Sequence, residues 1–72
     1  MSATIWSKPG CIACFKAKRL LNSKKVKFEE KVLGKDFDRD SFFQTFPTAK
    51  TFPQIVLDGK SIGGYDQLEE IL

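Results

Sequence analysis

The feature that most constrains this chain is a pair of cysteines, Cys11 and Cys14, the only two among its 72 residues. A Pro9-Gly10 turn precedes them, and a run with helical composition follows at once. The first thiol is therefore expected at the N-terminus of a helix. Unpaired backbone N–H groups and the positive end of the helix dipole stabilise a thiolate there, and the thiolate is the nucleophilic form of cysteine.

The spacing of the two thiols indicates a redox pair. Cys11 is the candidate attacking nucleophile, with the ammonium group of Lys8 as a further stabilising charge. Cys14 lies one helical turn later on the same face, where it can resolve a mixed disulfide by forming a Cys11–Cys14 bridge. A zinc site needs about four ligands, and the chain has no histidine and no third cysteine. A structural bridge across so short a loop would remove little chain entropy, so a catalytic pair is favoured.

Length and composition indicate one small globular domain spanning residues 1–72. The hydrophobic fraction is 42% and includes seven phenylalanines, which argues against disorder. No apolar run approaches the roughly 20 residues of a membrane span, and the N-terminal residues do not resemble a signal peptide. We therefore expect a cytoplasmic protein, in which a Cys-x-x-Cys pair is more plausibly catalytic than structural.

The net charge of +3 is concentrated in one region. Such a cluster could bind nucleic acid or an acidic partner, but it is also typical of the solvated face of a helix and the following strand. Aromatic residues do not interleave with it as stacking on single strands requires, so the solvated face is favoured. The cluster consists of Lys16, Lys18, Arg19, Lys24, Lys25 and Lys27.

The first half of the chain predicts a β-α-β unit. Residues 3–7 form a short β-prone segment, and residues 11–23 carry an apolar stripe with helical spacing that includes Cys14. Residues 26–32 then alternate as a strand does. The two strands should be parallel, and Cys14 should be less exposed than Cys11.

The second half predicts a short helix, a hairpin and a last helix. A polar linker at 34–40 leads to a helix at 41–46 capped by Asp38 or Asp40. Its phenylalanines at 42, 43 and 46 are expected to pack against the sheet. Asp58-Gly59 between apolar runs is typical of a type I′ hairpin turn. Asp66 and Glu69 have the spacing of a capping residue and its acidic partner.

Four stretches together resemble the glutaredoxin family, in particular its small bacterial and phage members. The resemblance implies an α/β, thioredoxin-like fold of order β-α-β-α-β-β-α. Its four-stranded mixed sheet has the order 2-1-3-4 and is flanked by three helices, the first and third on one face and the second on the other. It also implies a cis peptide bond between Phe52 and Pro53. The stretches are residues 7–14, 17–21, 51–55 and 62–68.

The same resemblance implies a glutathione-dependent thiol–disulfide oxidoreductase that has no permanently bound cofactor, acts as a monomer and donates electrons to ribonucleotide reductase. Cys11 and Cys14 would be catalytic. The backbone at Phe52 and Pro53 would pair with the cysteinyl part of glutathione. The γ-glutamyl carboxylate would lie at the start of the last helix, and the glycine carboxylate would meet nearby polar side chains. The implied contacts for the γ-glutamyl carboxylate are Gly64, Tyr65 and Asp66. Those for the glycine carboxylate are Lys8 together with Lys50 or Gln44.

Two alternatives remain open from the sequence. The family's usual Cys-Pro-Tyr-Cys is replaced here by Cys11-Ile12-Ala13-Cys14, which leaves room for a related redoxin reduced by thioredoxin reductase. A carrier of an iron–sulfur cluster or zinc would need a second chain, or glutathione, to complete four ligands.

Overall fold

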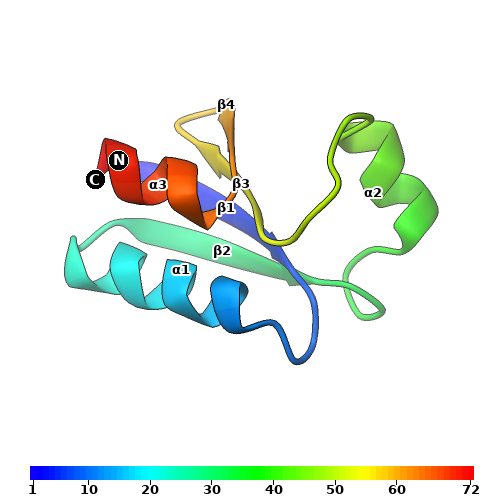
Figure 1. Cartoon of the computed structure of the whole chain (residues 1–72), viewed down its shortest axis with the longest axis horizontal. Coiled ribbons are helices and arrows are strands. Elements are labelled where there is room, and N and C mark those ends of the chain that lie inside the picture. The colour runs from blue at the N-terminus through cyan, green and yellow to red at the C-terminus, as the bar shows by residue number, and fades with distance from the viewer.

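The computed structural model describes all 72 residues as a four-stranded sheet with three helices (Figure 1). The strand order is β2-β1-β3-β4, which confirms the thioredoxin-like arrangement expected from the sequence. No helix is long and apolar enough to cross a membrane. The elements are β1 (Ser2–Ser7), α1 (Ile12–Ser23), β2 (Lys27–Val32), α2 (Arg39–Thr45), β3 (Gln54–Leu57), β4 (Lys60–Gly63) and α3 (Tyr65–Ile71).

The central strand of the sheet is β1. It pairs in parallel with β2 and antiparallel with β3, so that Ile5 lies opposite both Glu30 and Ile55. The turn between β3 and β4 has positive φ at both of its central residues, 50° at Asp58 and 81° at Gly59. A type I′ turn requires this conformation, so the predicted hairpin is confirmed.

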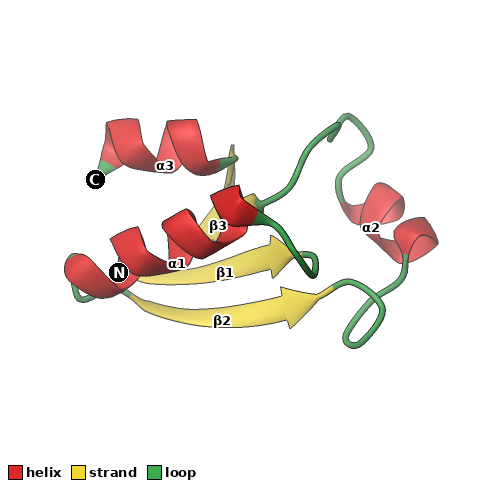
Figure 2. Ribbon diagram, turned by 60° about the horizontal axis from the view of Figure 1, so that its bottom comes forward, coloured by secondary structure: helices red, strands yellow, loops and turns green.

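One face of the sheet carries the main core. Helices α1 and α3 both lie over this face, as Figure 2 shows, and contact each other there. Ile5 and Ile55 from the sheet meet Ala17 and Leu21 from α1 and Leu68 from α3, and all five are fully buried. Burial of apolar surface is the main favourable term in folding, so these side chains hold both helices to the sheet.

An aromatic cluster holds α2, which lies beyond the carboxyl ends of β1 and β2 (Figures 1 and 2). Trp6 alternates with the core-facing Ile5, and its ring lies 5.4 Å from the ring of Phe46. Phe42 is buried and stacks on Phe52 at 4.6 Å between ring centroids. The expectation that all three phenylalanines of this segment pack inward is wrong for Phe43, which touches the edge of Phe42 but is 47% exposed.

The starts of α2 and α3 differ from the sequence-based expectation. Asp38 caps α2, because its Oδ1 accepts a hydrogen bond from the Ser41 backbone N–H at 2.8 Å, and the helix therefore begins two residues earlier than expected. This hydrogen bond lowers the pKa of Asp38 below its usual value. Asp66 does not cap α3. Gly64 is the N-cap, and its N–H donates to Oε1 of Gln67 at 2.9 Å.

We expect Leu21→Ala to lower the free energy of unfolding by about 3 kcal/mol, because it opens a cavity between α1 and the sheet. A chain of this length has a total stability of only several kcal/mol, so the variant should be close to unfolded at 37 °C. Urea titration followed by circular dichroism measures the change. Ile71→Ala, at a residue that is 53% exposed, is the control and should cost under about 0.5 kcal/mol.

Candidate active site

The two cysteines form a disulfide at the start of α1. Cys11 is the N-cap residue, with extended backbone angles of φ −96° and ψ 109°. Its Sγ accepts a hydrogen bond from the Cys14 backbone N–H at 3.1 Å. The N-cap position of Cys11 is confirmed, and the thiolate that this position would favour in the reduced protein stays a prediction.

The two sulfurs differ in their access to solvent. Cys14 is 2% exposed, whereas Cys11 is only half-buried. The sequence predicted this difference because Cys14 lies on the buried stripe of α1. An external disulfide therefore meets Cys11 first, and Cys14 is placed to react only with what Cys11 has captured.

A polar network lies beneath the cysteine pair. Glu30 of β2 points toward α1, where its Oε2 lies 2.8 Å from Nζ of Lys18 and accepts a hydrogen bond from the Ser7 hydroxyl at 2.8 Å. The hydrogen bond from Lys18, aided by that from Ser7, holds the pKa of Glu30 below its ordinary value of 4.5. The inward side of β2 thus carries a carboxylate with two partners on one of its oxygens.

A cavity of about 550 Å³ opens beside Cys11 on the side of α2, and we call it the α2 cavity. Three cations line it, Lys8, Arg39 and Lys50, and no carboxylate does. The Lys8 ammonium also lies 5.7 Å from the centre of the Phe52 ring. The cavity therefore suits an anionic ligand attached to a sulfur. The remaining lining residues are Gly10, Cys11, Ile12, Ala13, Phe42, Phe43, Ala49, Thr51 and Phe52.

The structure gathers some of the predicted glutathione contacts in this cavity. Lys8, Lys50 and Phe52 line it together with Cys11. The Phe52–Pro53 peptide bond is cis, as the resemblance implied. Pro53 itself is buried under Phe52 and does not line the cavity.

The remaining predicted contacts lie outside the α2 cavity. Gly64 lines a neighbouring polar cavity of about 450 Å³, which shares Ala49, Lys50 and Thr51 with the α2 cavity. A Cβ on Gly64 would lie 3.2 Å from the carbonyl oxygen of Pro53, so the start of α3 is close to the cis-proline segment.

Tyr65, Asp66 and Gln44 are not brought to Cys11. Tyr65 lines a shallow cavity between α1 and α3, and its hydroxyl donates to Glu69 at 3.1 Å. This bond to a carboxylate raises the pKa of Tyr65. Asp66 and Gln44 are exposed and line none of the cavities.

Several residues that line the α2 cavity were missed by sequence reasoning, among them Arg39 and Phe43. Arg39 was assigned to a polar linker, yet it is the first residue of α2 and lines the α2 cavity. Phe43 was assigned to the core, yet it lines the same cavity. Choosing Asp38 as the cap would have identified Arg39, since it moves the helix start to that residue. No group of three or more histidine, cysteine or acidic side chains could hold a metal ion.

A cysteine pair at the N-terminus of a helix, one exposed and one buried, on a thioredoxin-like sheet defines a thiol–disulfide redox protein. The family model for Glutaredoxin matches residues 3–62. The chain belongs to the glutaredoxin family, and the Cys11/Cys14 pair makes it a dithiol member.

Two relatives illustrate the similarity in sequence. Glutaredoxin 1 of Rickettsia bellii is 37% identical over 71 residues, which cover 93% of this chain and 72% of that protein. The hybrid peroxiredoxin hyPrx5 of Haemophilus influenzae is 45% identical over 69 residues, or 96% of this chain. The chain spans only 28% of the length of this hybrid protein.

Solved glutaredoxin structures share the fold. Glutaredoxin 1 from Francisella tularensis, in complex with cacodylate, has a TM-score of 0.82 at 26% identity, covering 96% of this chain and 88% of that one. A buckwheat glutaredoxin–glutathione complex has a TM-score of 0.79 at 26% identity, covering 94% of this chain and 64% of that one.

We expect Glu30→Gln to weaken the acid sensitivity of the fold. Because folding lowers the pKa of Glu30, the unfolded state binds its proton first as the pH falls below about 4.5. The stabilisation by this carboxylate is thus present above that pH and is lost as the pH falls toward the folded-state pKa. The variant should lose about 1 kcal/mol at pH 7 and much less at pH 3.

Urea titrations at pH 7 and pH 3 measure this effect. Glu70→Gln is the matched control, since Glu70 is exposed and forms no ion pair. An equal loss at both pH values for Glu30→Gln would contradict an electrostatic role for the network.

Proposed function

We propose that the protein is a glutathione-dependent dithiol oxidoreductase that reduces protein disulfides and mixed disulfides of glutathione. The observation that carries the proposal is the position of Cys11, at the N-cap of α1 and in the wall of a cavity lined by three cations and no carboxylate. Glutathione is an anionic thiol with two carboxylates, so its charge complements this cavity. The fold shared with the buckwheat glutaredoxin–glutathione complex supports the same ligand.

The reaction proceeds by two thiol–disulfide exchanges. The Cys11 thiolate attacks one sulfur of the substrate disulfide, forms a mixed disulfide and expels the other sulfur as a thiolate, which takes up a proton. Cys14 then loses its proton and attacks the Cys11 sulfur, which closes the intramolecular disulfide and releases the second substrate thiol. Two glutathione molecules return two electrons and leave as glutathione disulfide.

We further propose two kinds of protein recipient. Ribonucleotide reductase is the one implied by the resemblance to the family. An oxidised peroxiredoxin is supported by the 45% identity between this chain and part of a hybrid peroxiredoxin. Reduction of each purified recipient by the reduced protein, followed by mass spectrometry of the thiols, compares the two directly.

Cysteine variants test the redox assignment in an assay that couples glutathione and glutathione reductase to NADPH consumption. Cys11→Ser should abolish turnover, because the attacking sulfur is gone. Cys14→Ser should still reduce glutathione mixed disulfides but lose the reduction of protein disulfides that require both thiols. Retained activity in Cys11→Ser would refute the mechanism. Faster reduction by thioredoxin reductase than by glutathione would favour the alternative redoxin.

A lysine variant tests the ligand. Lys8→Gln should raise the KM for a glutathione mixed disulfide by about fivefold, because a charge-assisted contact to a carboxylate contributes on the order of 1 kcal/mol. Steady-state kinetics at low ionic strength measures the change. Lys35→Gln is the control, since Lys35 is equally exposed and lines no cavity. Equal effects of the two variants would argue against a carboxylate contact at Lys8.

A further inference from the structure

A second cavity, of about 370 Å³, opens beside the disulfide on the side of α1, and we call it the α1 cavity. It shares a wall with the α2 cavity that includes Cys11 and Ile12. Cys14, Phe15, Lys18 and Glu30 line the α1 cavity alone. Groups bound in either cavity would therefore adjoin the same reactive sulfur.

Two large apolar side chains are exposed at the α1 cavity. Ile12 is 74% exposed and Phe15 is 57% exposed. The fold does not need them there, because the buried stripe of α1 consists of Cys14, Ala17 and Leu21. Exposed apolar groups that gather at a reactive centre are typical of a surface that a partner covers.

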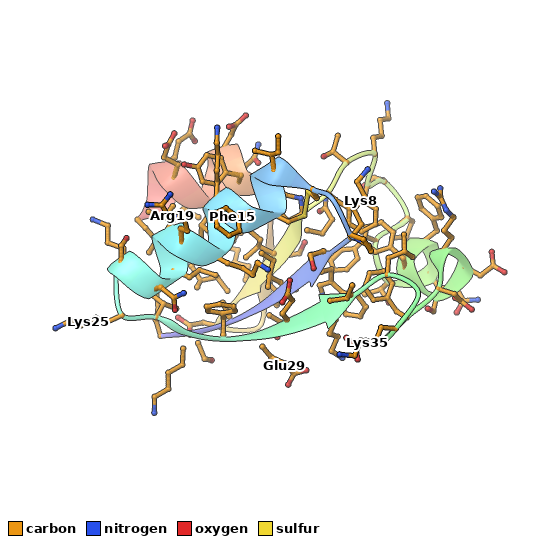
Figure 3. All side chains as sticks on the ribbon, turned by 90° about the horizontal axis from the view of Figure 1, so that it is seen from below. Lys8, Phe15, Arg19, Lys25, Glu29 and Lys35 are labelled. Atoms are coloured by element: carbon orange, nitrogen blue, oxygen red, sulfur yellow. A yellow bond between two sulfur atoms is a disulfide. The ribbon has the colours of Figure 1, made fainter.

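Positive charge continues from this apolar pair along α1. Lys16 and Arg19 follow Ile12 and Phe15 at a spacing of four residues, so each cation lies one turn beyond an apolar side chain on the same face. Figure 3 shows Phe15 and Arg19 next to each other on the outer side of α1. The carboxylate of this cavity, Glu30, is already paired with Lys18 and Ser7. An incoming acidic group therefore meets unpaired cations.

We propose that Ile12, Phe15, Lys16 and Arg19 form a docking surface for the polypeptide that carries the substrate disulfide. In the preferred substrate segment an apolar residue directly follows the cysteine, and an acidic residue lies two positions after the apolar residue. A step of four residues advances about 6 Å along α1, which an extended peptide spans in about two residues. The surface deepens the proposed function and rests on it, because it leaves the α2 cavity free for glutathione while the polypeptide occupies the other side of Cys11.

The test is a single-turnover reaction without glutathione. Pre-reduced protein is mixed with one of two cyclic peptide disulfides, and acid-quenched samples are separated by chromatography. Two electrons pass from the Cys11/Cys14 thiols to the peptide disulfide. One peptide carries Cys-Leu-Ser-Glu and the other carries Cys-Ser-Ser-Gln. We expect the first to react about tenfold faster, as partial burial of one leucine and one charge contact predict.

Substitutions on α1 should change this preference. Phe15→Ala should reduce the ratio of the two rates from about tenfold to about twofold, because the leucine loses its contact. The double variant Lys16→Glu, Arg19→Glu should make a Cys-Leu-Ser-Lys peptide react faster than the Cys-Leu-Ser-Glu peptide, with a difference that fades at high salt.

Phe43→Ala is the matched control, since Phe43 is a similarly exposed phenylalanine at the α2 cavity. It should change the rates of both peptides by the same factor, as should Ile71→Ala on α3. Equal rates for the two peptides with the unaltered protein would overturn the docking surface, as would an unchanged ratio in Phe15→Ala. Because the assay contains no glutathione, its result does not depend on whether glutathione is the physiological reductant.

Discussion

The pairing of β1 on both of its edges is the constraint on which the rest of the structure depends. Because β2 and β3 occupy its two sides, successive side chains of β1 face alternate sides of the sheet, and Ala3, Ile5 and Ser7 are the buried ones. Ile5 is fully buried in the core, and the Trp6 ring contacts Phe46, the C-cap residue of α2. The end of β1 therefore lies where both layers meet, and the chain leaves it directly into the turn that carries Cys11.

This arrangement places one cavity on each side of Cys11. Cys11 lies between a cavity bounded by the α2 side of the molecule and a cavity bounded by α1 and β2. The first is cationic without carboxylates, and the second contains a carboxylate, Glu30, that forms an ion pair with Lys18 and accepts a hydrogen bond from Ser7. Opposite layers of the fold thus give one sulfur two chemically different surroundings.

The sequence predicted those features that depend on local pattern. Alternation along 26–32 identified β2, the apolar spacing after Cys11 identified the buried face of α1, and Asp58-Gly59 identified the hairpin. Prediction from the sequence failed for side chains whose burial depends on how separate helices and strands pack together. The three phenylalanines at 42, 43 and 46 have the same local preference, but only Phe42 and Phe46 are buried.

Polar groups were the other source of failure. Asp66 was predicted to cap the last helix, yet Gly64 is the N-cap, and its N–H donates to the side chain of Gln67. Glu30 lies opposite the core-facing Ile5, at a position of β2 where an apolar residue would be expected. Its partner Lys18 comes from the helix above, and this pairing between elements cannot be read from either segment alone.

The burial of Cys14 fixes the regiochemistry of the return half of the cycle. Once the disulfide has closed, a thiolate arriving from solvent can align with only one of its two sulfurs, because the other is 2% exposed. Attack at Cys11 makes Cys14 the leaving group, so the attacking thiolate always forms a mixed disulfide with Cys11. A second thiolate then releases it from Cys11. Every mixed disulfide therefore forms and breaks at the Cys11 sulfur. The Cys14 sulfur only forms and breaks the internal disulfide with Cys11.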